Sequence, residues 1–158
     1  MPIQTSADLE ALAAVAAEGR VRCRVVGAGT VVTIEQVAQA KAAGASFTVS
    51  PGLDLDIVRA SAEAGLAPLP GVATPSEVQR ASREGLTWVK AFPASVLGAD
   101  WFTAMRGPLP QIKFVATGGM DAGNAAEFLA TGVRVVAVGS ALADDIQLPA
   151  LSALLGQR

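Results

Sequence analysis

Lys90 is the residue whose type and position in this chain best suit covalent chemistry. It closes an apolar run that starts at Leu86, where a buried strand is expected to end. Burial disfavours the ammonium form, and a neutral amine is what attack on a ketone to form an imine requires. The other lysines have ordinary places, Lys41 late in a helical pattern and Lys113 at the start of a strand. On position alone, a strand-end lysine that snorkels to solvent is an equally good interpretation.

Glycine-rich turns follow two later apolar runs, at Thr117-Gly-Gly119 and at Gly139-Ser140. Their backbone N–H groups lack side-chain obstruction, and a helix is expected to start after each, which favours a bound phosphate. Either turn alone is more simply a tight turn. Together with the lysine on the preceding strand, they predict a phosphosugar site. The earlier Gly27-Ala-Gly29 lacks the third glycine of a dinucleotide fingerprint.

Composition excludes several classes of protein. The 158-residue chain is 51% hydrophobic and 16% charged, which suits one packed domain spanning 1–158. It has no histidine, so Ser-His-Asp and Cys-His catalysis and histidine-ligated metals are excluded. The single cysteine, Cys23, is expected to pack as a small apolar side chain in a strand. A net charge of −2 with scattered arginines predicts no nucleic-acid partner.

Targeting signals are not evident. The first eight residues lack the basic and apolar segments of a signal peptide, and no stretch is long enough to span a bilayer. We therefore expect no membrane partner and a cytoplasmic location.

Short β-branched runs alternate with alanine-rich helical patterns, which indicates α/β organisation with parallel strands. Strands are expected at 21–26, 46–50, 67–69, 86–89, 112–115 and 133–138, and helices at about 6–19, 34–44, 55–64, 99–105, 122–129 and 148–155, with a further helix opened by Thr74-Pro75 and a turn at 70–73. This makes six strand–helix units. The polar and glycine-rich segments all follow strands, so in a parallel barrel they would meet at one rim, where barrel active sites lie.

Six segments, in this order and spacing, resemble the 2-keto-3-deoxy-6-phosphogluconate (KDPG) and 4-hydroxy-2-oxoglutarate (KHG) aldolases, from about Pro2 to Leu142. They are the segments 27–31, 50–52, 69–74, 89–94, 116–119 and 138–140. The resemblance implies a (β/α)8 TIM-barrel fold, usually trimeric, and a class I aldolase that needs no metal or cofactor. Such an enzyme cleaves a 2-keto-3-deoxy sugar acid phosphate to pyruvate and glyceraldehyde 3-phosphate.

The resemblance also implies roles for individual residues. Lys90 matches the Schiff-base lysine, and Thr117 matches the residue that holds the carboxylate region. The residues that match the lining of the pyruvyl pocket are Thr30, Pro51 and Phe92, and those that match the phosphate site are Gly118, Gly119, Gly139 and Ser140.

The chain departs from the family pattern in length. A complete barrel needs about 200 residues or more, and the six strands expected here leave the first two of the family unmatched. The family's proton-shuttling glutamate would fall just before Met1, and Gln4 takes the place of an arginine that binds the carboxylate. Glu10, Glu18 and Glu35 belong to helical patterns and are expected to be solvated rather than to replace that glutamate.

Three hypotheses follow. The first is an aldolase, impaired to the extent that the glutamate is needed. The second is a non-catalytic phosphosugar-binding or scaffold protein of the same fold. The third, ranked last because no acid–base pair is evident near the rim, is another phosphosugar enzyme such as an isomerase. The sequence leaves open the glyoxylate-yielding KHG activity, the aldehyde half and the stereochemistry at C4.

Self-association is expected because an unclosed parallel sheet would expose two strand edges. We therefore expect a homo-oligomer, or a rearranged N-terminal segment. Trp101 and Phe102 suit subunit contacts and core packing equally well.

Overall fold

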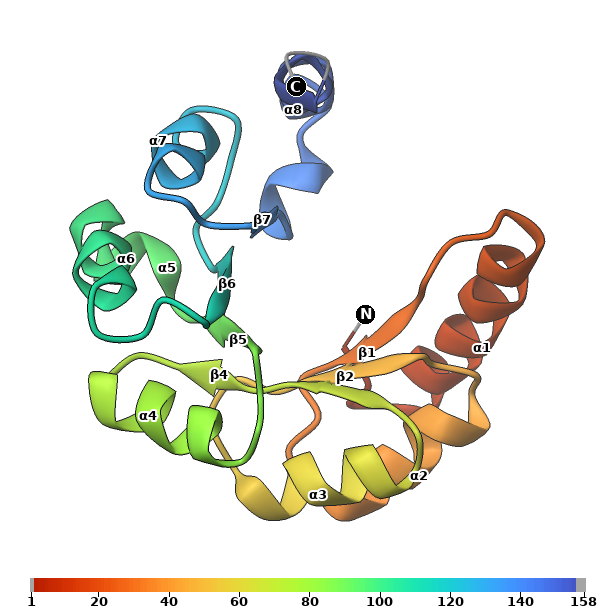
Figure 1. Cartoon of the computed structure of the whole chain (residues 1–158). Helices are drawn as coiled ribbons and strands as arrows, with labels where there is room; N and C mark the ends of the chain where they lie inside the picture. Colours follow the sequence, from red (N-terminus) through yellow and green to blue (C-terminus); the bar gives the residue numbers. More distant parts are fainter. Residues whose placement is uncertain (1, 156–158) are drawn as a thin grey trace. The chain divides into compact units, whose positions relative to one another are not determined.

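The computed structural model of the protein describes residues 2–155, and the side chains of residues 2–153. It contains two compact units, Met1–Gly71 and Val72–Arg158. Figure 1 shows the helices and strands of each unit along the chain.

The first unit is a three-stranded parallel sheet with its connecting helices. Its elements are α1 (Ser6–Val21), β1 (Gly27–Gly29), α2 (Ile34–Ala42), β2 (Phe47–Val49), α3 (Leu55–Glu63) and β3 (Ala67–Leu69). The strand order is β1-β2-β3, with Gly29 opposite Val49 and Val49 opposite Leu69. Each strand therefore ends at the same edge of the sheet.

The core of the first unit is aliphatic. Its buried members are Ile3, Leu12, Ala28, Val31, Val37, Ala40, Ala45, Ile57 and Leu66. One buried polar pair interrupts it, in which the Thr48 hydroxyl donates to the Ser61 hydroxyl oxygen at 2.8 Å. This bond satisfies two side chains that burial would otherwise penalise.

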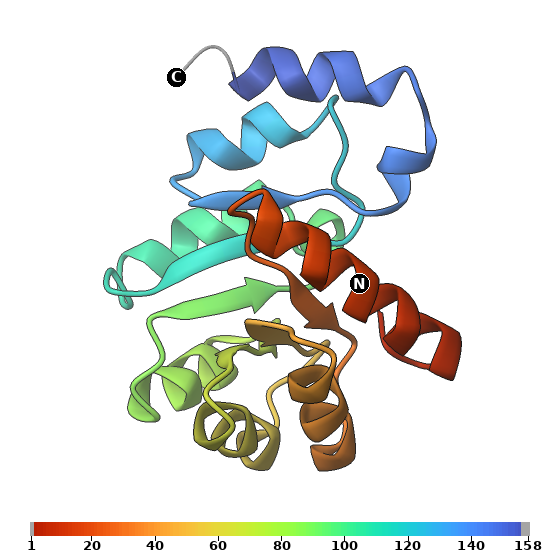
Figure 2. The same ribbon diagram turned by 90° about the vertical axis from the view of Figure 1, so that its right-hand side faces the viewer.

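The second unit contains a four-stranded parallel sheet. Its elements are β4 (Gly71–Val72), α4 (Pro75–Arg83), β5 (Trp88–Ala91), α5 (Ala94–Leu97), α6 (Ala99–Arg106), β6 (Lys113–Thr117), α7 (Ala125–Ala130), β7 (Val135–Ala137), the 3₁₀ helix η1 (Ser140–Ala143) and α8 (Gln147–Leu155). The order is β4-β5-β6-β7, with Lys90 opposite Val115 and Thr117 opposite Ala137. Figure 2 shows β5, β6 and β7 side by side.

Aromatic rings form the core between this sheet and α6. Phe102 is 1% exposed and meets Trp101, Phe114 and Phe128 edge-on, at ring-centroid distances of 5.1, 5.8 and 5.5 Å. Such pairs add about 0.5–1.5 kcal/mol each beyond the burial of apolar area. Phe102 thus belongs to the core, which the sequence had left open. Through these rings α6 packs on one face of β6.

Three helices begin with a reciprocal cap. In α1, α2 and α4 a threonine hydroxyl accepts the N–H of the residue three positions on, and that residue's side chain accepts the threonine N–H. The pairs are Thr5 with Asp8, Thr33 with Gln36, and Thr74 with Glu77. Each pair satisfies orphan backbone donors, which fixes where the helix starts.

The prediction of a strand at 21–26 is wrong. α1 continues to Val21, and the N–H groups of Arg22 and Arg24 donate back to the carbonyls of Glu18 and Gly19, at 3.0 and 2.7 Å. The backbone that a strand would need therefore closes the helix. Cys23 lies in this turn with φ 52°, and is exposed rather than packed in a strand.

The turn expected at 70–73 contains strand β4 instead. Pro70 has no N–H and cannot donate to the ladder, so the strand is interrupted between β3 and β4. The count is seven short strands in the described residues rather than six, although the six strand–helix units are present. β5 also runs past the expected end, which places Lys90 inside the strand.

None of the helices in the described part of the chain combines the length and apolar character that crossing a membrane requires.

Candidate active site

Lys90 lies on the face of β5 that the helices do not cover. Its chain neighbours Val89 and Ala91 are fully buried and point to the opposite face, because side chains alternate along a strand. Figure 1 shows α4 to α7 on one side of this sheet. Lys90 shares its face with Phe92, two residues on, and with Val115, its partner on β6.

The environment of Lys90 is apolar. The side chain is half-buried, and burial lowers the pKa of its amine from the ordinary value of 10.5. The Phe92 ring lies 4.2 Å from Nζ and opposes this effect, since an aromatic face stabilises the ammonium. Burial is the cause that prevails. The site therefore provides the partly desolvated lysine that imine formation uses.

A glycine turn lies beside Phe92 at the end of β6. Gly118 and Gly119 have φ of 94° and 72°. A Cβ built on Gly118 would lie 2.9 Å from the Phe92 ring, and one on Gly119 would lie 2.2 Å from the Ser95 hydroxyl. Glycine is required here both for conformation and for space. Thr117, the last residue of β6, is half-buried next to this turn.

Two residues that sequence reasoning missed hold the glycine turn. The Ser95 N–H donates to the Gly118 carbonyl at 3.1 Å, and Asn124 Nδ2 donates to the Gly119 carbonyl at 2.8 Å. Asp121 Oδ1 in turn accepts the N–H groups of Gly123 and Asn124. The Asp-Ala-Gly-Asn pattern is typical of such a turn and could have indicated it, whereas nothing local marks Ser95.

The second glycine turn is formed by Gly139 and Ser140. Gly139 and Ser140 are exposed and follow β7, the neighbour of β6. Ser140 opens η1, a single 3₁₀ turn of four residues. The expected helix after Gly119 begins only at Ala125, not at residue 122. The helix-dipole argument for both turns is therefore weaker than expected, and the case for phosphate depends on the backbone N–H groups of the turns themselves.

Thr30 and Pro51 belong to the first unit, at the ends of β1 and β2. Thr30 has φ 58°, a left-handed conformation that is strained for a β-branched residue and is found mostly at functional positions. Pro51 is exposed and borders a cavity of about 250 Å³ that Val31 and Ile57 also line. These two residues therefore lie at one edge of their sheet.

One negative finding concerns the described residues. No group of three or more Cys, Asp or Glu residues in that part of the chain is placed to hold a metal ion. The expected solvation of Glu10, Glu18 and Glu35 is confirmed, because all three are exposed.

Comparison with known proteins decides the family. A family model described as "Aldolase: KDPG and KHG aldolase" matches residues 2–151. The chain belongs to this family. The KDPG and KHG aldolases are enzymes that process small molecules, and the resemblance of the six segments is confirmed.

Curated members of this family are longer than the chain. The 2-dehydro-3-deoxy-phosphogluconate aldolase of Treponema pallidum is 41% identical over 139 residues, covering 86% of this chain and 64% of the relative. The chain thus spans about two thirds of the length of the first relatives it matches.

Solved structures of aldolases confirm the α/β, TIM-barrel type of fold. The KDPG aldolase of Legionella pneumophila, with pyruvate captured as a covalent carbinolamine, is 33% identical with a TM-score of 0.79, covering 85% of this chain and 66% of that one. The aldolase of Zymomonas mobilis ZM4 with 3-phosphoglycerate is 31% identical with a TM-score of 0.80, covering 97% of this chain and 73% of that one.

Proposed function

We propose that this aldolase chain cleaves 2-keto-3-deoxy-6-phosphogluconate through a Schiff base on Lys90. The neutral amine attacks the C2 ketone and loses water, giving an imine that is protonated. The C4 hydroxyl gives its proton to the water released on imine formation. At the same time the C3–C4 bond breaks and its electron pair passes into the iminium, which releases glyceraldehyde 3-phosphate. Protonation of the resulting enamine at C3 and hydrolysis then free pyruvate and the amine.

The observation that carries this proposal is the state of Lys90. Its amine is half-buried with a lowered pKa and lies on the uncovered face of β5, beside the ring of Phe92. A lowered pKa increases the neutral, nucleophilic fraction near neutral pH. A related enzyme, that of Legionella pneumophila, was captured with pyruvate as a covalent carbinolamine, which is the first adduct such an amine forms.

The glycine turns support a phosphorylated substrate. Gly118 and Gly119 have no side chain of their own and lie against Phe92 and Ser95, and Gly139 and Ser140 are exposed after the neighbouring strand. We assign these four residues to the phosphate, Thr117 to the carboxylate region, and Thr30, Pro51 and Phe92 to the pyruvyl pocket.

Borohydride reduction in the presence of pyruvate tests the lysine, with the modified residue located by mass spectrometry. The expected adduct lies on Lys90 and is absent from Lys90→Met. Lys113→Met is the matched control, because Lys113 opens the next strand and is exposed. An unmodified Lys90 in folded protein, with phosphate esters still bound, would instead favour the non-catalytic phosphosugar-binding alternative.

The substrate is tested separately by product analysis. We expect glyceraldehyde 3-phosphate from KDPG to form faster than glyoxylate from 4-hydroxy-2-oxoglutarate, because only the first substrate has a phosphate for the glycine turns. Equal rates, or preference for the second substrate, would remove the role proposed for those turns.

We also propose that the protein is a homo-oligomer, as a trimer. Large apolar side chains are exposed in the described residues, among them Val21, Val96 and Ile146 at 80–81%. Sedimentation velocity at micromolar concentration should give the mass of three chains, and a stable monomer would contradict this. A single domain over 1–158 and a cytoplasmic location stay predictions.

A further inference from the structure

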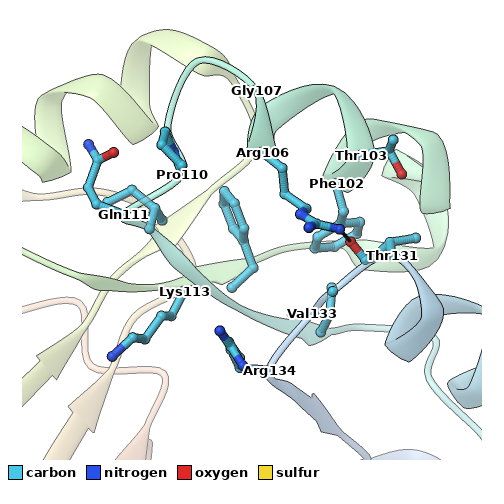
Figure 3. Close-up of a pocket in the computed structure, with 13 residues that line it drawn as sticks. Phe102, Thr103, Arg106, Gly107, Pro110, Gln111, Lys113, Thr131, Val133 and Arg134 are labelled. Atoms are coloured by element: carbon cyan, nitrogen blue, oxygen red, sulfur yellow. Dashed lines mark hydrogen bonds between the residues drawn. The ribbon is translucent and has the colours of Figure 1, made fainter.

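A cavity of about 710 Å³ lies in the second unit, at the amino ends of β6 and β7. Figure 3 shows α6, the loop after it and the starts of the two strands around this space. Its walls include Phe102, Phe114 and Val133, which belong to the core. The volume is in the range of small-molecule sites, about 300–1,000 Å³.

The charged side chains that line this cavity are all positive. They are Arg106 from α6, Lys113 at the start of β6 and Arg134 just before β7, all of them exposed. None of the thirteen lining residues, all within the described chain, is an aspartate or glutamate. The protein as a whole has a net charge of −2, so this concentration of cations is not a consequence of composition.

Arg106 is held in position. Its Nη1 donates to the Thr131 carbonyl at 2.8 Å, the dashed line in Figure 3. The guanidinium also lies against Gly132, where an added Cβ would come within 2.8 Å of Nη1. Because a guanidinium has five N–H donors, this bond leaves donors for a ligand. The Arg106 side chain is therefore already ordered, and ligand binding does not have to restrict its conformations.

Arg134 lies just before β7 and beside the start of β6, whereas the Lys113 side chain lies on the opposite face of β6, together with its partner Trp88. The Arg134 N–H donates to the Phe114 carbonyl at 3.1 Å, which puts Arg134 beside the start of β6. The Lys113 ammonium lies 5.4 Å from the centre of the Trp88 ring. Neither salt bridge described for this chain, Arg22 with Glu18 or Arg59 with Asp56, involves these cations. The ion pairs described for this chain therefore do not offset the positive charge of this lining.

We propose that this cavity binds a small phosphate monoester with an apolar body. The dianion would lie between Arg106 and Arg134, since guanidinium groups bind phosphate through paired N–H donors. Lys113 would add only long-range attraction, and the apolar body would pack toward Phe114 and Val133. A carboxylate monoanion would match the three positive charges less well.

This site is distinct from the candidate active site. Lys113 and Thr117 are the first and last residues of β6, and the glycine turn follows Thr117. A ligand in the cavity therefore binds at the end of the strands opposite to the glycine turns. Barrel enzymes place their chemistry at the carboxyl ends, so binding here would act on stability or regulation.

Titration of the ¹⁵N-labelled full chain with phenyl phosphate tests the proposal, followed by amide chemical shifts. Shifts are expected at Gly107, Gly132, Val133 and Arg134. Arg134→Gln should weaken this binding by about tenfold or more, the effect of losing a charged hydrogen bond, and Lys113→Gln by about twofold through lost long-range attraction. Arg83→Gln, an exposed arginine on α4 that does not line the cavity, is the matched control and should bind as wild type.

Three comparisons complete the experiment. Inorganic phosphate should bind more weakly than phenyl phosphate, because it lacks the apolar body, and glycerol 3-phosphate should fall between them. Lys90→Met should leave these shifts unchanged, so failure of the aldolase proposal would not affect the result. Shifts confined to Gly118, Gly119 and Gly139, or unchanged binding in both Arg134→Gln and Lys113→Gln, would overturn the proposal.

Discussion

Gly118→Ala is the substitution that most directly tests how the glycine turn is coupled to the lysine. The new Cβ would lie 2.9 and 3.0 Å from two carbons of the Phe92 ring and 3.1 Å from Pro93 Cα. It would also place an alanine at φ 94°. The substitution therefore adds both a conformational penalty and a steric conflict at the residue that covers the Lys90 amine.

Each of the two contributions has an expected magnitude. A non-glycine residue in left-handed conformation costs about 1–2 kcal/mol. Overpacking adds typically about 1–3 kcal/mol, and the half-buried Phe92 ring can move, which favours the lower end. We expect Gly118→Ala to lower the free energy of unfolding by about 2–4 kcal/mol.

Gly85→Ala is the matched control. Gly85 has φ 80°, close to that of Gly118, but an added Cβ meets no heavy atom within 4 Å among the described residues. It should show only the conformational cost of about 1–2 kcal/mol. Urea unfolding of both variants measures the difference.

The functional readout is pyruvate trapping by borohydride at Lys90. Displacement of the Phe92 ring changes the space above the amine, and a misplacement of about 1 Å can cost about a hundredfold in rate. We expect trapping to fall by at least about tenfold in Gly118→Ala and to be unchanged in Gly85→Ala. Equal destabilisation and equal trapping in the two variants would refute the coupling between the turn and the site.

Further predictions concern pH and stability. Burial lowers the pKa of Lys90, so the folded protein binds fewer protons than the unfolded chain between that lowered pKa and 10.5. The free energy of unfolding should therefore rise with pH in this window. Urea unfolding at a series of pH values should show this rise in the wild type and not in Lys90→Met. The rate of pyruvate trapping should likewise have its midpoint below pH 10.5, and a midpoint at the ordinary lysine value would contradict the burial argument. Thr74→Ala removes the hydroxyl that accepts the Glu77 N–H and should cost about 1 kcal/mol in the same unfolding assay, whereas an unchanged midpoint would show that the cap is not needed. Phe102→Ala should cost about 3–5 kcal/mol, with loss of near-ultraviolet circular dichroism, and a loss below 1 kcal/mol would contradict its place in the core.

Helices proved more predictable from the sequence than strands, because their start and stop signals are local. α2 begins after Thr33 and ends before Gly44, as its cap and glycine indicate. β1 is only Gly-Ala-Gly and has no side-chain pattern to detect. Its first glycine is needed because a Cβ there would lie 2.3 Å from the Phe47 ring of the neighbouring strand. That requirement depends on a residue 20 positions away.

The candidate site shows the same division. Lys90 is identifiable from its chemistry and its apolar run, and the glycine turns from their composition. The hydrogen bond from the Ser95 N–H to the Gly118 carbonyl could not be predicted, because it joins residues on different elements. The late start of α7 results from the turn that Asp121 forms, which takes residues that a helical pattern assigns to the helix.

The reciprocal caps of α1, α2 and α4 differ in one chemical respect that sets how each helix responds to acid. Hydrogen bonds from Thr5 and Gln4 lower the pKa of Asp8, and those from Ala73 and Thr74 lower that of Glu77. The stabilisation from these carboxylates is present above their unfolded-state pKa and is lost as pH falls through the lowered values. Gln36 does not titrate. Acidification should therefore fray the first turns of α1 and α4 while α2 keeps its own, and amide hydrogen exchange at low pH would make the three helices distinguishable.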